Sequence, residues 1–561
     1  MRKTIIKLIS NNTNLPTESI INLLEIPPKE EMGDFAFPCF TLAKTEKKSP
    51  LLISQELTEK LKNNLPKEII DITYTGAYVN FFTNKTILAE KIINETKKDN
   101  WGILELDNKK IGIEYPAPNT NKPLHVGHLR NMAIGDSITN ITQTTGNKIY
   151  HLNLYNDRGI LISKSMTAYL NYGNNTTPET ENISGDKFVG KFYVLFNEKV
   201  KDNPKLEEEA KELLKKWESG DKETIKLWTK MNNWTYEGIL KTFNTFGLKK
   251  IDKNYHESKM YKEGKEIVEE GLKKGIFSKK DGAIIINLEK DKLGEKVLLR
   301  SDGTSVYITQ DIFLAEKKIK DFNLDSSYYI VGNDQIYHFQ VLFTILEKLG
   351  IKKDWKHFAY GMVTLPSGKM KSRDGTAKSA DDFIKDTKQL AIKGLKERSL
   401  NLTEKELEIR GLTIALAAIK YFLLKVDIKK NIVFNPKEAL AFEGNTGPYL
   451  LYSYARANSI TKKAKIENSE IKILEIHPLE SSLIKKINSF PETIEKSYKQ
   501  LAPNIIANYS FELAQTFNEF YHTCPVMNSK QSQFRLELVK AFKITLQKSL
   551  ALLGIETLEE M

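Results

Sequence analysis

The sequence predicts a chain with three parts: a mixed α/β region, an α/β region with a helical insertion, and a final all-α region. Three observations predict this order. Strand-like apolar runs occur at residues 78–82, 110–115, 282–287, 296–300 and 328–331. Residues from about 185 to 275 interleave Lys and Glu at helical spacing. From about residue 400 onward, almost every segment is typical of an amphipathic helix.

Domain boundaries follow from these patterns and from length. A chain of 561 residues exceeds what one hydrophobic core supports, so several domains are expected. Residues 1–100 are predicted to form an α+β domain. Residues 101–385 are predicted to form an α/β domain with an insertion at about 185–300, and residues 386–561 a helical domain.

The charge balance suits a polyanionic partner. Lys and Arg number 84 against 72 Asp and Glu, which gives a formal net charge of +12. Positive charge over a large chain favours nucleic acid. A genome biased toward lysine codons would give the same excess on solvated faces, so both interpretations stay open at this point.

Cysteine usage and hydropathy indicate a soluble, cytoplasmic protein with no membrane association. Cys39 and Cys524 are the only cysteines, which excludes a disulfide framework and a cysteine zinc site. The N-terminus lacks the apolar core of a signal peptide. The longest apolar stretch, at 412–424, is too short to span a bilayer and predicts a buried helix.

The first chemical motif lies in residues 117–131 (APNTNKPLHVGHLRN), between a predicted strand and a helix that opens near His125. Pro123 favours an extended entry, and Gly127 lets an aromatic base approach the backbone. His125 and His128 share a face at the helix N-terminus, where anions are favoured. A capped, partly exposed helix start is the alternative. Zinc is not expected, because the other histidines and the cysteines are scattered.

The second motif lies about 240 residues downstream, at 361–376 (GMVTLPSGKMKSRDGT). Gly368 and Gly375 flank a predicted mobile loop that could close on a polyphosphate and stabilise charge as a P–O bond breaks. Standing alone, the loop would be a basic surface hairpin. Its cationic side chains are Lys369, Lys371 and Arg373.

The pair HVGH and KMKSR resembles the HIGH and KMSKS signatures of class I aminoacyl-tRNA synthetases. The resemblance implies a Rossmann-like parallel-sheet catalytic domain with ATP at the carboxyl ends of the strands. The implied ATP-binding residues are Pro118, His125, Gly127, His128, Met370, Lys371 and Ser372. The implied catalytic residues are His125, His128, Lys122, Lys369, Lys371 and Arg373.

The resemblance narrows to arginyl-tRNA synthetases and runs almost from end to end. The matching segments are 33–38 (GDFAFP), 114–119, 302–311, 331–335 (VGNDQ), 442–452, 520–526 and 552–555. It implies an N-terminal domain that binds the D-loop of tRNA and a helical-bundle domain that binds the anticodon. It implies an arginine pocket of Glu114, Asn119, Tyr307, Asp311 and Gln335, with Asn119 placed for the α-amino group.

The chemistry of these residues agrees with a guanidinium ligand, which carboxylates and aromatic rings bind best. Tyr307 and Asp311 are four apart, hence on one face if 305–317 is helical. Taken singly, Asp311 is typical of a first-turn helix acid, and Glu114 of a satisfied strand end.

The family's second KMSKS lysine falls on Ser372 here. A lysine just before the first motif is thought to substitute in this family, and Lys122 occupies that place. Which of Lys122, Lys369, Lys371 and Arg373 meets the transition state stays open. The implied tRNA contacts are Tyr78, Asn80, Tyr449, Tyr452, Tyr521 and Met561, whose aromatic rings suit unstacked bases.

The resemblance implies two steps: arginine attacks the α-phosphate of Mg-ATP, and a terminal tRNA ribose hydroxyl then attacks the adenylate. L-Arginine, ATP with Mg²⁺ and arginine tRNA are the expected partners, and tRNA is expected to be required for activation. No permanently bound cofactor or structural metal and no editing domain are expected, and the chain is expected to be a monomer. Three alternatives remain: a synthetase for cysteine or lysine, a catalytically silent tRNA-binding protein, and a small HxGH nucleotidyltransferase.

Overall fold

The structure is a computed structural model that describes residues 1–260, 263–366, 378–397, 402–464 and 471–561. It divides into two units, each built from segments far apart in the sequence. The first unit comprises Met1–Trp101, Ile460–Ser489 and Gln515–Thr545. The second comprises Gly102–Ser459, Phe490–Ala514 and Leu546–Met561. The three-domain boundaries at about 100 and 385 stay predictions.

In the first unit, a three-stranded antiparallel sheet packs against short helices around a core that includes Ile5, Phe37 and Phe81. The strand order is β1-β3-β2, and the strand predicted at 78–82 is confirmed as β3. The strands are β1 (Phe35–Pro38), β2 (Ile69–Thr75) and β3 (Tyr78–Thr83). The helices that lie wholly in this unit are α1 (Arg2–Ser10), α2 (Thr17–Leu23), α3 (Phe40–Glu46), α4 (Pro50–Lys62), α5 (Lys85–Thr96) and α18 (Pro478–Asn488).

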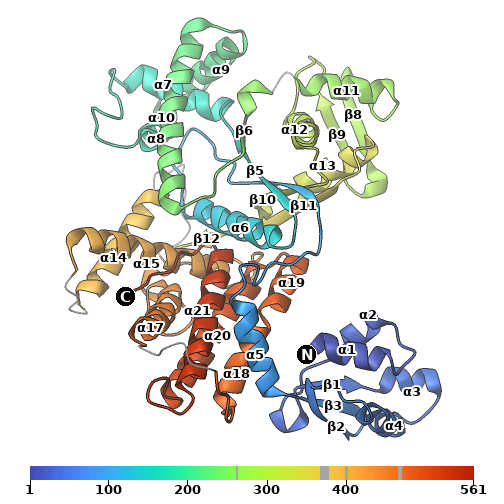
Figure 1. Ribbon diagram of the computed structural model, residues 1–561. Coiled ribbons are helices and arrows are strands. Elements are labelled where there is room, and N and C mark those ends of the chain that lie inside the picture. Colours follow the sequence, from blue (N-terminus) through green and yellow to red (C-terminus); the bar gives the residue numbers. More distant parts are fainter. Residues whose placement is uncertain (261–262, 367–377, 398–401, 465–470) are drawn as a thin grey trace. The chain divides into compact units, whose positions relative to one another are not determined.

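The second unit is built on a five-stranded parallel sheet of order β11-β10-β4-β5-β6 (Figure 1). Its strands are β4 (Lys110–Glu114), β5 (Lys148–Tyr155), β6 (Lys253–His256), β10 (Ser326–Gly332) and β11 (Asp354–Tyr360). The strands predicted at 110–115 and 328–331 are confirmed as β4 and β10. The parallel-sheet fold implied by the resemblance is therefore confirmed.

The strand order reverses beside β4. The chain passes from β4 outward to β5 and β6, and later returns to the opposite side of β4 as β10 and β11. Glu114 ends β4 and stands in register with Tyr329 of β10. Open parallel sheets bind ligands in the crevice outside the carboxyl ends of the strands at such a reversal. This crevice is where the candidate residues were expected.

Helices α6, α12 and α13 pack against the parallel sheet, and α6 joins β4 to β5. The predicted insertion contains helices α8 to α10 but also β6, which belongs to the parallel sheet. The helices of this part are α6 (Val126–Gln143), α7 (Ile160–Tyr172), α8 (Gly185–Asp202), α9 (Lys205–Glu218), α10 (Lys222–Phe246), α11 (Gly264–Lys273), α12 (Tyr307–Phe322) and α13 (Ile336–Lys348).

The strands predicted at 282–287 and 296–300 form a separate antiparallel sheet. Their bounds are β8 (Ala283–Leu288) and β9 (Gly294–Leu299), with β7 (Ser278–Lys280) beside β8. Local sequence pattern identifies a strand but not its partner, which is why these two could not be assigned to a sheet in advance.

Beyond residue 377 the described chain is almost entirely helical, as predicted. The apolar stretch at 412–424 is confirmed as the buried part of α15. A two-residue pairing of β12 (Val363–Thr364) with β13 (Ile432–Val433) is the exception. No helix of the described chain is long and apolar enough to cross a membrane. The helices are α14 (Ala380–Lys396), α15 (Glu404–Leu424), α16 (Pro436–Ala439), α17 (Gly447–Lys463), α19 (Phe490–Gln500), α20 (Pro503–Thr523) and α21 (Ser532–Leu552).

Candidate active site

The HVGH motif forms the N-terminal end of α6, as predicted. His125 is the N-cap residue, and its Nδ1 accepts a hydrogen bond from the backbone N–H of Gly127 at 3.1 Å. The backbone N–H of His125 donates in turn to Nδ1 of His128 at 3.2 Å. Both imidazoles therefore cap the helix, which fixes their rings and leaves each Nε2–H as a donor.

Both histidines are held in the neutral form. Burial, with the nearby Lys122 ammonium, lowers the pKa of His125 to about 4. Burial and the same cation, together with His125, also lower the pKa of His128. A Cβ at Gly127 would lie 2.8 Å from Cε1 of His125, so glycine is the residue that leaves the capping ring in place. The two histidines can therefore both cap the helix and bind a ligand. Capping uses Nδ1 of each ring and leaves each Nε2–H to donate to a ligand.

The second motif is represented by its flanks, because Lys369, Met370, Lys371, Ser372 and Arg373 lie outside the described residues. After the motif, the backbone N–H of Ala380 donates to the carbonyl of Leu124 at 2.7 Å, and Ser379 forms a β-bridge with His125. Before these five residues, at the first residue of the motif, the Arg130 guanidinium donates to the carbonyl of Gly361 at 2.6 Å. Both flanks therefore contact the start of α6.

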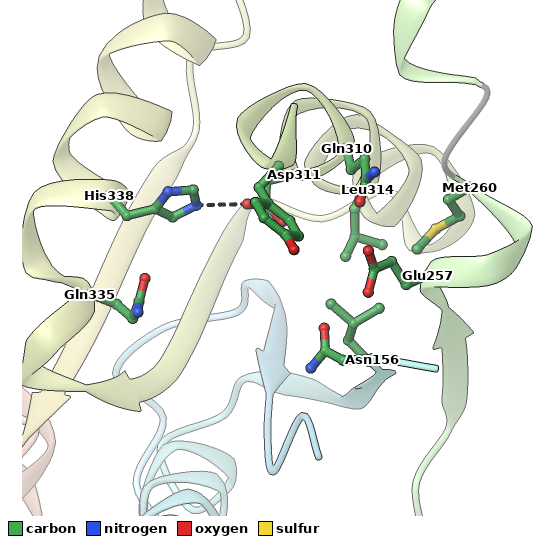
Figure 2. Close-up of a pocket in the computed structure, with 10 residues that line it drawn as sticks. Asn156, Glu257, Met260, Gln310, Asp311, Leu314, Gln335 and His338 are labelled. Atoms are coloured by element: carbon green, nitrogen blue, oxygen red, sulfur yellow. Dashed lines mark hydrogen bonds and ion pairs between the residues drawn. The ribbon is translucent and has the colours of Figure 1, made fainter. Parts of the chain in front are cut away.

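A cavity of about 330 Å³ opens where the carboxyl ends of the strands meet α12 (Figure 2). Three of the predicted arginine-pocket residues line it: Tyr307, Asp311 and Gln335. Tyr307 is 71% exposed at the start of α12, and Asp311 lies one turn further along the same face. The full lining is Leu154, Asn156, Glu257, Met260, Tyr307, Gln310, Asp311, Leu314, Gln335 and His338.

Two carboxylates face the cavity. Asp311 Oδ2 lies 2.6 Å from Nε2 of His338, the pair joined by the dashed line in Figure 2. Glu257 follows β6 directly and begins a short 3₁₀ turn, Glu257–Lys259. Burial raises the pKa of Glu257 to about 7, opposed by the Arg158 cation and reinforced by the carboxylates of Asp157 and Asp311. The cavity therefore holds an acid that a cationic ligand would ionise.

The turn that carries Glu257 is anchored by the buried carboxylate of Asp157. Asp157 accepts hydrogen bonds from the backbone N–H and the hydroxyl of Ser258, both at 2.8 Å. It also accepts a bond from the Tyr236 hydroxyl at 2.8 Å and lies 3.1 Å from Nδ1 of His256. Sequence reasoning missed Glu257, because the short polar strand before it shows no clear alternation that would mark its end.

Glu114 and Asn119 do not line the cavity. Glu114 is buried in an ion pair with Lys318 of α12, whose ammonium lies 4.4 Å from the ring centroid of Tyr329. Burial lowers the pKa of Lys318, but the Glu114 carboxylate together with Tyr329 and Asp311 outweighs it, and the net shift is upward. Asn119 forms a β-bridge with Asn156, which does line the cavity.

The candidate tRNA contacts lie in both units. In the first, Tyr78 packs edge-on against Phe40, which is 53% exposed, at a centroid distance of 5.8 Å. Asn80 is buried and donates to the Thr75 hydroxyl at 3.2 Å. Tyr521 stacks on Phe517 at 6.2 Å.

In the second unit, Tyr449 and Tyr452 lie on α17, one turn from each other. Arg456 donates to the Tyr452 hydroxyl at 2.8 Å, and Tyr449 packs against Phe511. Met561 is half-buried at the end of the chain. In the described part of the chain, no group of three or more His, Cys, Asp or Glu side chains could hold a metal ion.

Comparisons with known proteins cover the whole chain. Three family models match: the N-terminal domain of arginyl-tRNA synthetase at residues 1–83, the catalytic domain of class I (R) tRNA synthetases at 90–436, and the DALR anticodon-binding domain at 450–561. The arginine–tRNA ligase of Treponema denticola is 43% identical over 96% of this chain and 94% of its own. That of Borrelia duttonii is 40% identical over 100% and 98%.

A solved structure agrees with the sequence relatives. The arginyl-tRNA synthetase of Thermus thermophilus matches with a TM-score of 0.85 and 25% identity, over 100% of both chains. The helix that begins at HVGH, the acidic cavity at the strand reversal and these full-length matches point the same way. The chain therefore belongs to the arginyl-tRNA synthetases of class I.

Proposed function

We propose that this chain is an arginine–tRNA ligase and that the cavity beside α12 binds the substrate arginine, with its guanidinium between Asp311 and Glu257. Family membership supports the overall reaction, in which arginine is activated with ATP and transferred to tRNA. The observation that supports the pocket is the pair of carboxylates in a cavity of about 330 Å³ at the strand reversal. A guanidinium is a donor-only cation that carboxylates satisfy with charge-assisted hydrogen bonds.

The other pocket residues complete this assignment. Tyr307 offers an aromatic face to the guanidinium, and Gln335 an amide. Asn119, next to Asn156, would receive the α-amino group. Glu114 would support the pocket indirectly. Its ion pair with Lys318 holds α12 against β4, and α12 carries Tyr307 and Asp311.

We assign ATP, as its Mg²⁺ complex and a substrate, to the start of α6. His125, Gly127, His128 and Pro118 would contact the adenine and phosphates, together with Met370, Lys371 and Ser372. Two neutral imidazoles with Nε2–H donors at a helix N-terminus can bind phosphate oxygens without taking a proton from them. Lys122, Lys369, Lys371 and Arg373 would supply the cationic charge.

The chemistry requires little from a general base. The arginine carboxylate is already a nucleophile and attacks the α-phosphate in line, so the P–O bond to pyrophosphate breaks and arginyl-adenylate forms. Positioning and charge stabilisation carry the rate. The terminal ribose hydroxyl of arginine tRNA (the 2′ position in class I) then attacks the adenylate carbonyl, and AMP leaves.

For tRNA we keep Tyr78, Asn80, Tyr449, Tyr452, Tyr521 and Met561 as the proposed contacts. The exposed ring of Phe40 and the partly buried ring of its neighbour Tyr78 support base stacking on the first unit. We further propose that activation requires tRNA, that the enzyme acts as a monomer without a bound cofactor, and that it works in the cytoplasm, where its relatives' role in translation would place it.

Arginine-dependent ATP–pyrophosphate exchange, measured with and without arginine tRNA, tests the proposal. Lysine and cysteine serve as the control amino acids. We expect exchange only when arginine and its tRNA are both present. Exchange driven by lysine or cysteine would refute the assignment of the pocket to arginine, and tight tRNA binding without exchange for any amino acid would identify a silent tRNA-binding protein.

A further inference from the structure

Helix α9 of the charged insertion is linked to the cavity through the side chain of Arg158. This residue follows β5 in the loop before α7, and its side chain is 12% exposed. Arg158 Nη2 lies 2.6 Å from the carboxylate of Glu218, the last residue of α9. The guanidinium carbon lies 5.7 Å from the ring centroid of Trp217, its neighbour on that helix. The end of α9 therefore holds the Arg158 guanidinium by an ion pair and an aromatic face.

On its other side, Arg158 meets a residue of the cavity lining. With the Gln310 amide oriented as its neighbours require, its oxygen accepts from Arg158 Nη1 at 3.2 Å. Its nitrogen then donates to Glu257 Oε1 at 3.1 Å. Gln310 and Glu257 both line the cavity and lie next to each other in Figure 2.

Arg158 determines which groups donate and which accept in these hydrogen bonds. An arginine side chain only donates, so it selects the amide orientation that turns the Gln310 oxygen toward it. The amide nitrogen must then point at Glu257. In the reverse orientation the amide nitrogen would face the Arg158 guanidinium, and two donors would meet with no acceptor between them.

Arg158 is also a rival to the substrate. It is a guanidinium beside an acid that we assign to a guanidinium, and direct pairing with Glu257 would neutralise that acid. Glu218 supplies the competing carboxylate that holds Arg158 away. A charge-assisted hydrogen bond between a guanidinium and a carboxylate fixes the position of the guanidinium when the carboxylate is itself held in place.

We propose that Arg158 is a positioning residue for arginine binding, held by Glu218 and Trp217 of the insertion and acting on Glu257 through Gln310. This inference rests on the proposed function, because it assigns Glu257 to the substrate guanidinium. It gives the insertion a role in amino-acid affinity, separate from any contact with ATP.

A second ion pair on α9 provides a matched control. Glu207, in the first turn of α9, lies 2.9 Å from Lys164 of α7. Its side chain is 36% exposed, against 42% for Glu218. Glu207→Gln and Glu218→Gln each remove one α9 ion pair, but only Glu218 leads to the cavity.

The experiment measures the arginine KM and the ATP KM in pyrophosphate exchange with saturating tRNA, using the full-length protein. For Glu218→Gln we expect the arginine KM to rise about tenfold, which is the scale of one charge-assisted hydrogen bond, with the ATP KM within about twofold. Glu207→Gln should leave both values unchanged. Arg158→Met should raise the arginine KM, and adding Glu218→Gln to it should have no further effect.

Equal effects of Glu207→Gln and Glu218→Gln would mean that the pair only docks α9, and would overturn the relay. Additive effects of the Arg158 and Glu218 changes would also overturn the proposed relay, which is the set of contacts from Glu218 through Arg158 and Gln310 to Glu257. Melting temperatures, measured alongside, identify any variant that is not folded. Absence of arginine-dependent exchange in the unaltered protein would overturn the proposed function and the relay together, whereas the first two outcomes overturn the relay alone.

Discussion

Glu257 makes arginine binding depend on pH in a specific way. Its carboxyl has a pKa of about 7 in the ligand-free enzyme, because burial and two neighbouring carboxylates outweigh Arg158. The substrate guanidinium requires the ionised form. Below pH 7, binding must therefore expel a proton, and the apparent affinity for arginine falls as the pH falls. Above pH 7 the carboxylate is already present, and the dependence should flatten.

The magnitude follows from the ionised fraction. One unit below a pKa of about 7, roughly one tenth of the groups are ionised, and one unit above, roughly nine tenths. The arginine KM at pH 6 should therefore be about tenfold higher than at pH 8, with a midpoint near pH 7. The assay is pyrophosphate exchange at saturating ATP and tRNA over pH 6 to 8.5.

Two variants separate Glu257 from its neighbours. The groups that face it are Asp157, Asp311 and Arg158, and His338 lies beyond Asp311. Glu257→Gln should raise the arginine KM and abolish its slope between pH 6 and 8. His338→Gln should keep the slope. A slope that persists in Glu257→Gln and disappears in His338→Gln would refute the reasoning and assign the titration to the histidine.

Three further predictions concern the other parts of the site. Gly127→Ala places a Cβ 2.8 Å from Cε1 of His125. Single-turnover adenylate formation should therefore slow by about a hundredfold, with arginine affinity unchanged. An unchanged rate would contradict the capped geometry. Lys318→Met leaves the buried Glu114 carboxylate unpaired, and urea denaturation should show a loss of about 3–5 kcal/mol that adding Glu114→Gln largely restores. Tyr78→Ala should raise the KM for tRNA by about tenfold, as expected for one lost stacking contact, without altering exchange at saturating tRNA, and an unaltered KM for tRNA would remove Tyr78 from the interface.

Local signals in the sequence were sufficient for the start of α6. Glycine and proline punctuation and two histidines three apart predict a helix start, and the structure places them there. Tyr307 and Asp311 likewise share a face of α12 and line one cavity, because helical spacing is a local property.

Long-range pairing could not be predicted in the same way. Glu257 was missed because β6 is a four-residue strand with polar residues, which gives no clear alternation. Glu114 was expected in the arginine pocket, but its carboxylate is paired with Lys318, more than two hundred residues away. The local sequence around Glu114 or Lys318 does not indicate that the two side chains pair. Their burial and their contact depend on how α12 packs on β4.

The central claim is that two carboxylates in one cavity select a guanidinium. The most direct test compares arginine with citrulline, which replaces the guanidinium by an uncharged urea group of nearly the same shape. The account predicts arginine-dependent exchange and a kcat/KM for citrulline lower by about a thousandfold or more, because citrulline has no positive charge to offset the carboxylates of Asp311 and Glu257. Citrulline within tenfold of arginine would contradict the account.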